Sequence, residues 1–204
     1  MARLISQTFL TLDGVSQGPG GPDEDTSGGF DLGGWVWPYF DEAAGDQVAT
    51  WFKEADAFLL GRRTYDIFAA YWPHHVEPGD PVSEGLERLP KYVASHTLTH
   101  PEWAGTTVLD GDVPHRVAEL KERYPHEVQI HGSLQLTGFL LRHRLVDEMR
   151  LLYFPVVLGR GRRLFEGATA PTAYQLADHQ VTPSGINLVT YRLEGEPRFG
   201  TVGE

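Results

Sequence analysis

The chain has 204 residues, of which 41% are apolar, contains no cysteine and carries a formal net charge of −11. This length and apolar content suit one domain with a sizeable core, whereas the lack of cysteine excludes disulfides, thiolate zinc sites and a cysteine nucleophile. The acidic charge argues against a broad contact with nucleic acid or anionic lipid, because phosphate groups bind basic surfaces.

The N-terminal segment shows no targeting signal. Residues 1–7 lead directly into a strand-like alternation, without a basic start followed by a long apolar run. No apolar stretch approaches the roughly 20 residues that cross a bilayer. We therefore expect a cytoplasmic protein that has no membrane partner.

The first part of the chain predicts a strand, a long loop, and then a helix, a strand and a helix. Residues 4–12 are rich in β-branched and apolar side chains, as is typical of a strand. Residues 16–34 are rich in Gly, Pro, Asp and Ser, which predicts a flexible loop of the kind that serves as a lid. Residues 41–54 show one apolar stripe at helical spacing. Residues 57–60 form a short, fully apolar strand, as expected inside a parallel sheet, and a second helix follows over residues 63–70.

Strands and helices alternate in the rest of the chain. Residues 73–90 predict another loop, because prolines and glycines are frequent there. The strands predicted beyond it are residues 92–94, 106–109, 128–130, 149–158, 173–181 and 186–193. The helices predicted there are residues 114–124 and 134–141. This order predicts a three-layer α/β fold with a mostly parallel central sheet, helices on both faces and a C-terminal antiparallel β-hairpin.

Three strand ends carry groups that suit a phosphate. In the first, an apolar strand ends at Gly61 and a helix begins at once, which exposes unpaired backbone N–H groups and the positive end of the helix dipole. Arg62, Arg63 and the Thr64 hydroxyl add further donors. The alternative interpretation is an ordinary strand-to-helix turn with solvated arginines.

The second strand end is Gly132-Ser133-Leu134-Gln135, where a pyrophosphate would lie against a helix N-terminus. The full GxGxxG pattern is absent, and Ser133 has the alternative role of capping its own helix. The third is Ser95-His96-Thr97, for which local turn hydrogen bonds are the alternative. Because ligands collect at the carboxyl ends of parallel strands, these segments are expected to converge on one crevice.

Several motifs occur in the order seen in one family. Gly61-Arg62-Arg63-Thr64-Tyr65 looks like the Gly-Arg-x-Thr-Tyr segment of dihydrofolate reductases, and Leu12-Asp13-Gly14 resembles the Ser-Leu-Asp-Gly of the bacterial riboflavin-pathway reductase domain. Residues 132–136, 145–148 and 155–165 follow the C-terminal signature of that domain. The chain therefore resembles the dihydrofolate reductase-like family, and within it the C-terminal reductase domain of riboflavin biosynthesis.

The resemblance implies an NADPH-dependent reductase that transfers a hydride to a small planar heterocycle, pterin-like or pyrimidine-like, and that forms a homodimer. The cofactor-binding residues that it implies are Leu12, Val15, Gly61, Arg62, Arg63, Thr64, Ser95, His96, Gly132, Ser133, Leu134 and Gln135. The substrate-binding residues that it implies are Phe9, Trp37, Val48 and Phe52.

The resemblance also implies a role for each segment. Residues 61–64 would hold the cofactor phosphates, with the arginines near the 2′-phosphate, and residues 132–135 would receive the pyrophosphate. Ser95 and His96 would approach the adenosine. Phe9 would lie with Leu12 and Val15 near the nicotinamide, under the loop of residues 16–34. A bound water or an unidentified side chain would supply the proton.

The chain departs from the family at three of these positions. His96 stands where an arginine is common, which weakens the preference for NADPH over NADH. Ser133 stands where a second glycine is common, so its side chain must either donate to the phosphate or crowd it. Val48 replaces the acidic residue that binds a pterin, and Asp46 would point about 200° around the helix from it. Dihydrofolate is therefore an unsuitable substrate.

Other residues have two interpretations each. Trp35, Trp37, Tyr39 and Phe40 either pack the lid or stack on a planar substrate. Adjacent histidines at 74 and 75 project apart, so we expect no metal site. Asp147-Glu148 is expected to anchor the fold. A non-catalytic nucleotide-binding or flavin-binding protein on the same fold is the alternative function.

Overall fold

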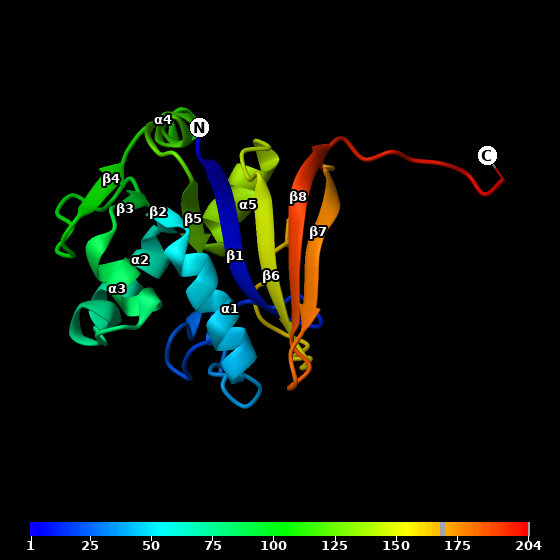
Figure 1. The fold of residues 1–204 in the computed structure, drawn as a ribbon, viewed down its shortest axis with the longest axis horizontal. Helices are drawn as coiled ribbons and strands as arrows, with labels where there is room; N and C mark the ends of the chain where they lie inside the picture. Colours follow the sequence, from blue (N-terminus) through cyan, green and yellow to red (C-terminus); the bar gives the residue numbers. More distant parts are fainter. Residues whose placement is uncertain (168–169, 204) are drawn as a thin grey trace.

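The computed structural model describes residues 1–167 and 170–203. Eight strands form one sheet in the order β4-β3-β2-β5-β1-β6-β8-β7 (Figure 1). The strands are β1 Arg3–Thr11, β2 Ala55–Gly61, β3 Lys91–Ala94, β4 Thr106–Leu109, β5 Glu127–His131, β6 Glu148–Phe154, β7 Ala173–Val181 and β8 Asn187–Gly195.

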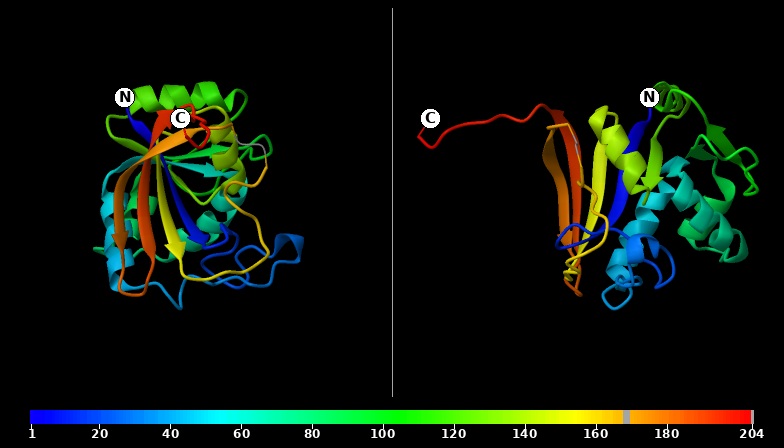
Figure 2. Two further views of the ribbon diagram at one scale, coloured as in Figure 1. Left: turned by 90° about the vertical axis from the view of Figure 1, so that its right-hand side faces the viewer. Right: turned by 180° about the vertical axis from the view of Figure 1, so that it is seen from behind.

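Helices cover both faces of the sheet. The α-helices are α1 Glu42–Lys53, α2 Arg62–Tyr71, α3 Pro81–Arg88, α4 Val113–Arg123 and α5 Leu134–Arg142, and the short 3₁₀ turns are η1 Ser27–Gly29 and η2 Trp72–His74. Helices α1, α2 and α3 cover one face, and α4 and α5 cover the other (Figure 2). None of the helices within the described residues is long and apolar enough to cross a membrane.

The strands from β4 to β6 run parallel to their neighbours, and β8 joins β6 in antiparallel orientation before β7 closes the sheet. The carboxyl ends of β1, β2, β3 and β5 therefore lie at one edge. This architecture is the predicted one, including the C-terminal hairpin. The continuously apolar run in β2 is explained by its central place, since Phe58, Leu59 and Leu60 are all fully buried between the two helical layers.

Two predictions about secondary structure are wrong. The segment of residues 73–90 is not all loop, because α3 forms within it: Asp80 accepts hydrogen bonds from the amides of Val82 and Ser83 as the N-cap, and Pro81 starts the helix. The strand predicted over residues 149–158 ends at Phe154. Pro155 follows it and has no N–H with which to continue the ladder.

Candidate functional site

The turns after β2 and β5 are joined directly through Ser133. Its hydroxyl accepts a hydrogen bond from the Gly61 amide at 2.8 Å and bonds the Thr64 hydroxyl at 2.9 Å. The Ser133 amide also donates to the Thr64 hydroxyl at 3.0 Å. Two of the three predicted phosphate segments therefore form one connected structure at the carboxyl ends of neighbouring strands.

The helices that start from these two turns have open N-termini. The N-cap positions of α2 and α5 are Gly61 and Ser133, and neither supplies a side-chain capping bond. The other three α-helices each have an aspartate that caps the first turn: Asp41, Asp80 and Asp112. The first-turn N–H groups of α2 and α5 are thus free to bind an external anion, which the helix dipoles also favour.

The turn after β5 has an unusual backbone. Gly132 and Ser133 both adopt left-handed conformations, with φ of 58° and 54°. For serine this conformation costs free energy that glycine does not pay. The alternative in which Ser133 caps its own helix is wrong, because the side chain points to Gly61 and Thr64 instead.

The third predicted segment lies beside the first. Arg62 donates from Nη1 to the Thr97 hydroxyl at 3.2 Å, which links the turns after β2 and β3. The Ser95 hydroxyl accepts hydrogen bonds from the amides of Thr97 and Leu98. These are the local turn hydrogen bonds that were the alternative to a phosphate site at this segment. His96 is exposed and bonds Asp110 at the end of β4, 3.1 Å away.

The loop of residues 16–34 is tied to the predicted cofactor segment and to the loop after β6. Arg63 donates to the Ser27 hydroxyl at 3.2 Å and lies 3.5 Å from Asp25, which also pairs with Arg162. Arg162, Arg160, Gly161 and residues of the first loop line a cavity of about 410 Å³. The loop therefore lies across the carboxyl edge of the sheet, as a lid would.

Asp13 fixes the end of β1 to the loop that follows β6. It accepts hydrogen bonds from the Thr11 hydroxyl at 2.6 Å and from the amides of Leu158 and Gly159, and it pairs with Arg163. Burial raises the pKa of Asp13, but the hydrogen bonds outweigh it and lower the pKa to about 2. The carboxylate of the Leu-Asp-Gly motif therefore has a structural role here.

The residues predicted near the nicotinamide differ in accessibility. Leu12 is 58% exposed, whereas Val15 is fully buried beneath the lid, where Gly161 and Phe30 lie close to it. Of the phosphate segment, Leu134 is half-buried and Gln135 is exposed. Of Leu12 and Val15, Leu12 is the one whose side chain solvent and a ligand reach.

The predicted substrate residues form two groups. Phe9 packs with Phe40 and Phe154 at ring-centroid distances of 6.1 and 5.6 Å. The rings of Trp37 and Phe40 lie 5.7 Å apart, centroid to centroid. Trp37 is nevertheless 62% exposed, and its Nε1 donates a hydrogen bond to the Gly20 carbonyl. Phe40 thus contacts both Phe9 and Trp37, and the hydrogen bond from Trp37 to Gly20 fixes the loop of residues 16–34.

Val48 and Phe52 form the second group, on the buried face of α1. Asp46 is exposed on the same helix, so no carboxylate replaces the acid that is missing at Val48. Phe52 packs against the ring of His131 at 4.5 Å. The surface beneath α1 is therefore apolar where a pterin would need a carboxylate.

His131 is a residue that the sequence analysis did not single out. It ends β5, one residue before the Gly132-Ser133 turn, and its Nε2 lies 3.3 Å from the Gln129 side chain. Burial, and secondarily the positive charge of Arg150, lowers the pKa of His131 to about 3. The imidazole is therefore neutral at physiological pH and does not serve as a strong proton donor. The signal in the sequence was its place at the carboxyl end of a predicted strand, directly before Gly132-Ser133.

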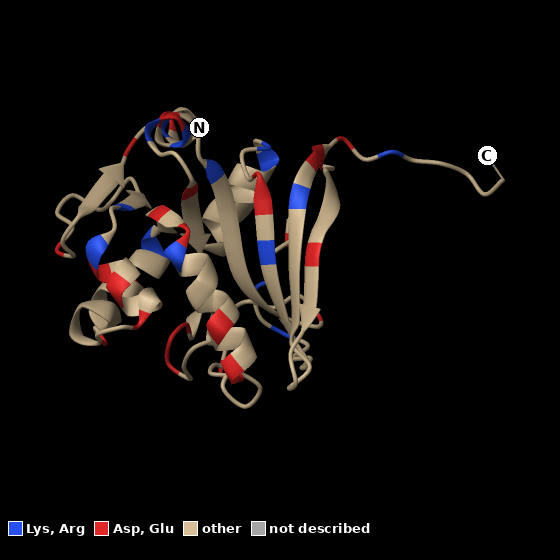
Figure 3. Ribbon diagram, viewed as in Figure 1, with Lys and Arg blue, Asp and Glu red and all other residues tan. Residues whose placement is uncertain are grey.

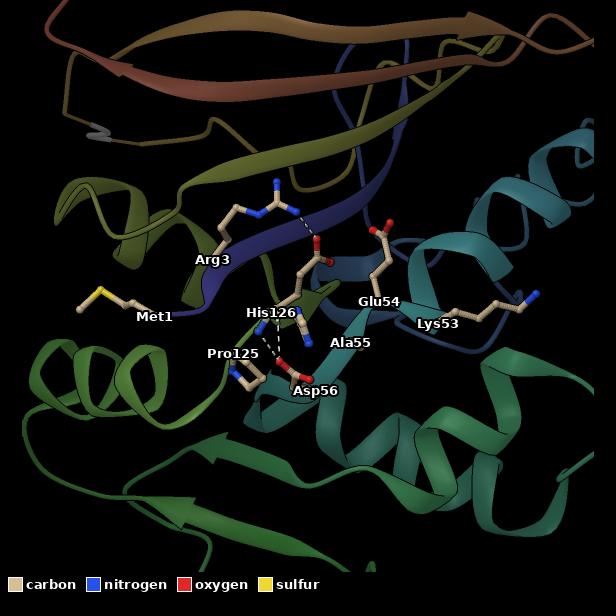
Figure 4. A pocket seen from close by; sticks show the side chains of 9 residues that line it. Met1, Arg3, Lys53, Glu54, Ala55, Asp56, Pro125 and His126 are labelled. Atoms are coloured by element: carbon tan, nitrogen blue, oxygen red, sulfur yellow. Dashed lines mark hydrogen bonds and ion pairs between the residues drawn. The ribbon is translucent and has the colours of Figure 1, made fainter.

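The amino edge of the sheet has a polar cavity of about 530 Å³ (Figure 4). Arg3, Asp56 and Glu127 come from the starts of β1, β2 and β5 and line this cavity. It lies at the opposite end of the strands from the predicted cofactor segments. It is therefore not the predicted crevice.

A buried ion-pair network adjoins this cavity. The Arg150 guanidinium is almost fully buried and pairs with Glu127 at 2.7 Å and Glu148 at 3.0 Å. Arg3 and Arg192 bond the same two carboxylates from the surface. Figure 3 shows acidic and basic residues next to one another along β6 and β8. The Asp147 carboxylate accepts a hydrogen bond from the Leu4 amide. Asp147 and Glu148 therefore anchor the start of β6 to β1 and the ion-pair network, as expected.

Sequence comparison matches residues 2–188 to the RibD C-terminal domain. The uncharacterized protein YyaP of Bacillus subtilis (strain 168) is 25% identical over 197 residues, which cover 95% of this chain and 96% of that protein.

Several solved structures have the same fold. A putative riboflavin biosynthesis protein from Shewanella sp. PV-4 superposes with a TM-score of 0.73 at 22% identity, covering 95% of this chain and 99% of that one. The diaminohydroxyphosphoribosylaminopyrimidine deaminase/5-amino-6-(5-phosphoribosylamino)uracil reductase of Thermotoga maritima superposes with a TM-score of 0.63 at 17% identity. That alignment covers 94% of this chain and 56% of the Thermotoga maritima chain.

Proposed function

The chain belongs to the RibD C-terminal domain family, and from this premise we propose that it is a reductase that binds NADPH and transfers a hydride to a small planar heterocycle. The Thermotoga maritima protein with the same fold is named as a uracil reductase, which supports a pyrimidine-like substrate over a pterin. The buried apolar side chain of Val48 supports the same choice, because a pterin needs a carboxylate for its paired N–H donors.

The observation that carries this proposal is the pair of uncapped helix N-termini at neighbouring strand ends. α2 and α5 direct their free N–H groups to the region where Ser133 joins Gly61 and Thr64. Two helix dipoles and two sets of amides suit the two phosphates of a pyrophosphate better than one set would. Helices α1, α3 and α4 lack this property, since aspartates occupy their N-termini.

The residues present fit a dinucleotide along the carboxyl edge. Gly61, Thr64 and the Gly132-Ser133 turn would hold the pyrophosphate, while Arg62 and Arg63 would lie near the 2′-phosphate. Ser95 and His96 would line the adenosine end. Leu12 and Phe9 would border the nicotinamide, with Val15 supporting them from below. Leu134 and Gln135 would contribute the first amides of α5.

The bound cofactor would supply the hydride for reduction of the substrate ring. The chain's own part is to orient the two rings and to exclude bulk water. Phe9 and Trp37 offer apolar and aromatic surface for a planar ring, whereas Phe52 is buried and supports the site from beneath, against His131. We assign the proton to a water molecule, because His131 is neutral and Val48 carries no acid.

The test is a titration of the purified chain with NADPH, followed by tryptophan fluorescence and thermal shift. We expect binding in the micromolar range for the wild type and loss of at least tenfold in affinity for Arg62→Ala and Arg63→Ala. Arg116→Ala removes a surface arginine from α4 and should leave binding unchanged. Absence of NADPH binding would overturn the proposed function.

Catalysis is tested separately from binding. Oxidation of NADPH in the presence of uracil-type, pterin or quinone acceptors is expected with the pyrimidine-like compounds. Tight NADPH binding without turnover of any acceptor would favour the alternative of a non-catalytic nucleotide-binding protein. A yellow preparation with bound flavin would favour a flavoprotein instead.

We also propose that the chain forms a homodimer through β7. This strand is the last in the sheet order, so its outer edge lacks a partner strand within the described residues. Leu176 and Val181 on it are 54% and 58% exposed. An open edge with exposed apolar side chains is suited to pairing with a second copy.

A further inference from the structure

Each basic side chain that is expected near the cofactor 2′-phosphate is already paired with a carboxylate. The pairs are Arg62–Asp66, Arg63–Asp25 and His96–Asp110. Arg62 bonds both oxygens of Asp66 from Nε at 2.9 Å, and Asp25 lies 3.5 Å from Arg63. This part of the proposed site therefore offers little net positive charge.

These pairs occupy one continuous surface. Arg62 connects the turn after β2 to Thr97 in the turn after β3. His96, in that same turn, connects to Asp110 at the end of β4. Because β2, β3 and β4 are neighbours in the sheet, the three turns lie side by side.

Asp110 differs from the other two carboxylates in its partner. The hydrogen bond from His96 lowers the pKa of Asp110, with a further contribution from the Gly111 amide, so the group is ionised at neutral pH. Beside the ionised Asp110, His96 gives the pair no net positive charge with which to attract a dianionic phosphate. Both side chains are more than 70% exposed, at 75% and 79%, and a ligand therefore reaches them.

We infer that Asp110 is a specificity-determining residue that lowers the preference of this chain for NADPH over NADH. The inference rests on the proposed cofactor site. A carboxylate beside the ribose repels a 2′-phosphate and accepts a hydrogen bond from a free 2′-hydroxyl. The preference of the wild-type protein for NADPH over NADH is accordingly smaller than it would be with an uncharged residue at position 110.

The experiment compares both dinucleotides in the wild type and in Asp110→Asn. Asparagine keeps the oxygen that bonds His96 and Gly111 but removes the charge. We expect Asp110→Asn to strengthen NADPH binding about three- to tenfold and to leave NADH binding within about twofold, with the difference shrinking in about 0.5 M salt. Asp178→Asn is the matched control, because it removes one charge from β7 at the far edge of the sheet.

The outcomes separate the inference from the proposed function. If both dinucleotides bind the wild type but Asp110→Asn leaves their ratio unchanged, the inference is wrong and the reductase proposal stands. An equal change in Asp178→Asn would also overturn it, since the effect would then come from net charge alone. If neither dinucleotide binds the wild type, the proposed function and the inference are both wrong.

Discussion

The Gly61 amide donates to the Ser133 hydroxyl at 2.8 Å, across 72 residues of sequence. This bond joins the starts of α2 and α5, the two helices with open N-termini. It fixes the distance between the two sets of free amides that a pyrophosphate would bridge. Ser133 is thus a positioning residue for the proposed cofactor site.

Ser133→Ala tests this relationship. The variant leaves the Gly61 amide without its partner and removes one of the two bonds between Ser133 and the Thr64 hydroxyl. We expect the free energy of unfolding to fall by about 1–2 kcal/mol in urea titrations and NADPH affinity to fall about tenfold. Thr50→Ala removes an exposed hydroxyl from α1 and serves as the control. Unchanged NADPH affinity in Ser133→Ala would show that the bond has no part in positioning.

His131 makes the stability of the chain depend on pH. Its folded-state pKa of about 3 lies below the ordinary value of 6.5, because burial and the charge of Arg150 disfavour the protonated form. The stability that the neutral ring contributes is therefore complete above about pH 6.5 and is lost as the pH falls towards 3. The expected slope in this window is about 1.4 kcal/mol per pH unit.

The measurement is urea unfolding between about pH 7 and pH 5, above the range where carboxylates titrate. His131→Gln should flatten the curve in this window, since glutamine carries no titratable group. His179→Gln removes an exposed histidine of β7 and should leave the slope as it is in the wild type. Equal slopes in the wild type and His131→Gln would contradict the assignment.

Arg150 balances two buried carboxylates. Arg150→Ala leaves Glu127 and Glu148 with the exposed Arg3 and Arg192 as their cationic partners among the described residues. We expect a loss of about 3–5 kcal/mol in the free energy of unfolding, which is typical when one member of a buried ion pair is removed. Arg192→Ala breaks only one exposed pair with Glu148 and should cost less than about 1 kcal/mol. Similar losses for the two variants would show that burial does not strengthen this network.

Periodicity predicted most of the fold because the buried strands and amphipathic helices have strong patterns. The run 57–60 is apolar throughout, and α1 has one buried stripe. The helix α3 was missed because prolines and glycines surround it, although Asp80-Pro81 is an N-cap followed by a first-turn proline. Frequent prolines and glycines favour a loop in this segment, and the Asp80 cap outweighs them in the folded chain.

The candidate site was predictable only in part. The turns at Gly61 and Gly132 were visible as strand-to-helix junctions, but their contact depends on β2 and β5 being neighbours. That order comes from crossovers, which the spacing of residues does not specify. The Arg62–Asp66 pair was readable from its i,i+4 spacing, whereas the pairing of His96 with Asp110 required the order of β3 and β4.

Gly161 controls how the lid packs against the loop after β6. A Cβ at this position would lie 2.6 Å from Val15 and 2.8 Å from Phe30, and φ is +115°. Gly161→Ala should therefore displace the loop of residues 16–34 and speed its cleavage in limited proteolysis. Gly159→Ala is the control, because φ is +75° there but nothing lies within 4 Å of the added carbon. Equal cleavage rates in Gly161→Ala and Gly159→Ala would show that faster cleavage comes from backbone strain at positive φ and not from the clash with Val15 and Phe30.

The exposed edge strand predicts the behaviour of the chain in solution. If β7 pairs with a second copy, sedimentation equilibrium should give twice the mass of the single chain at micromolar concentration. Leu176→Lys places a charge on this strand and should yield monomers, because lysine on an edge strand opposes pairing. Glu119→Lys introduces a lysine on α4 instead, away from β7, and should leave the mass at the dimer value. A monomeric wild type would refute the β7 dimer, and a dimer that survives Leu176→Lys would place the interface on another surface.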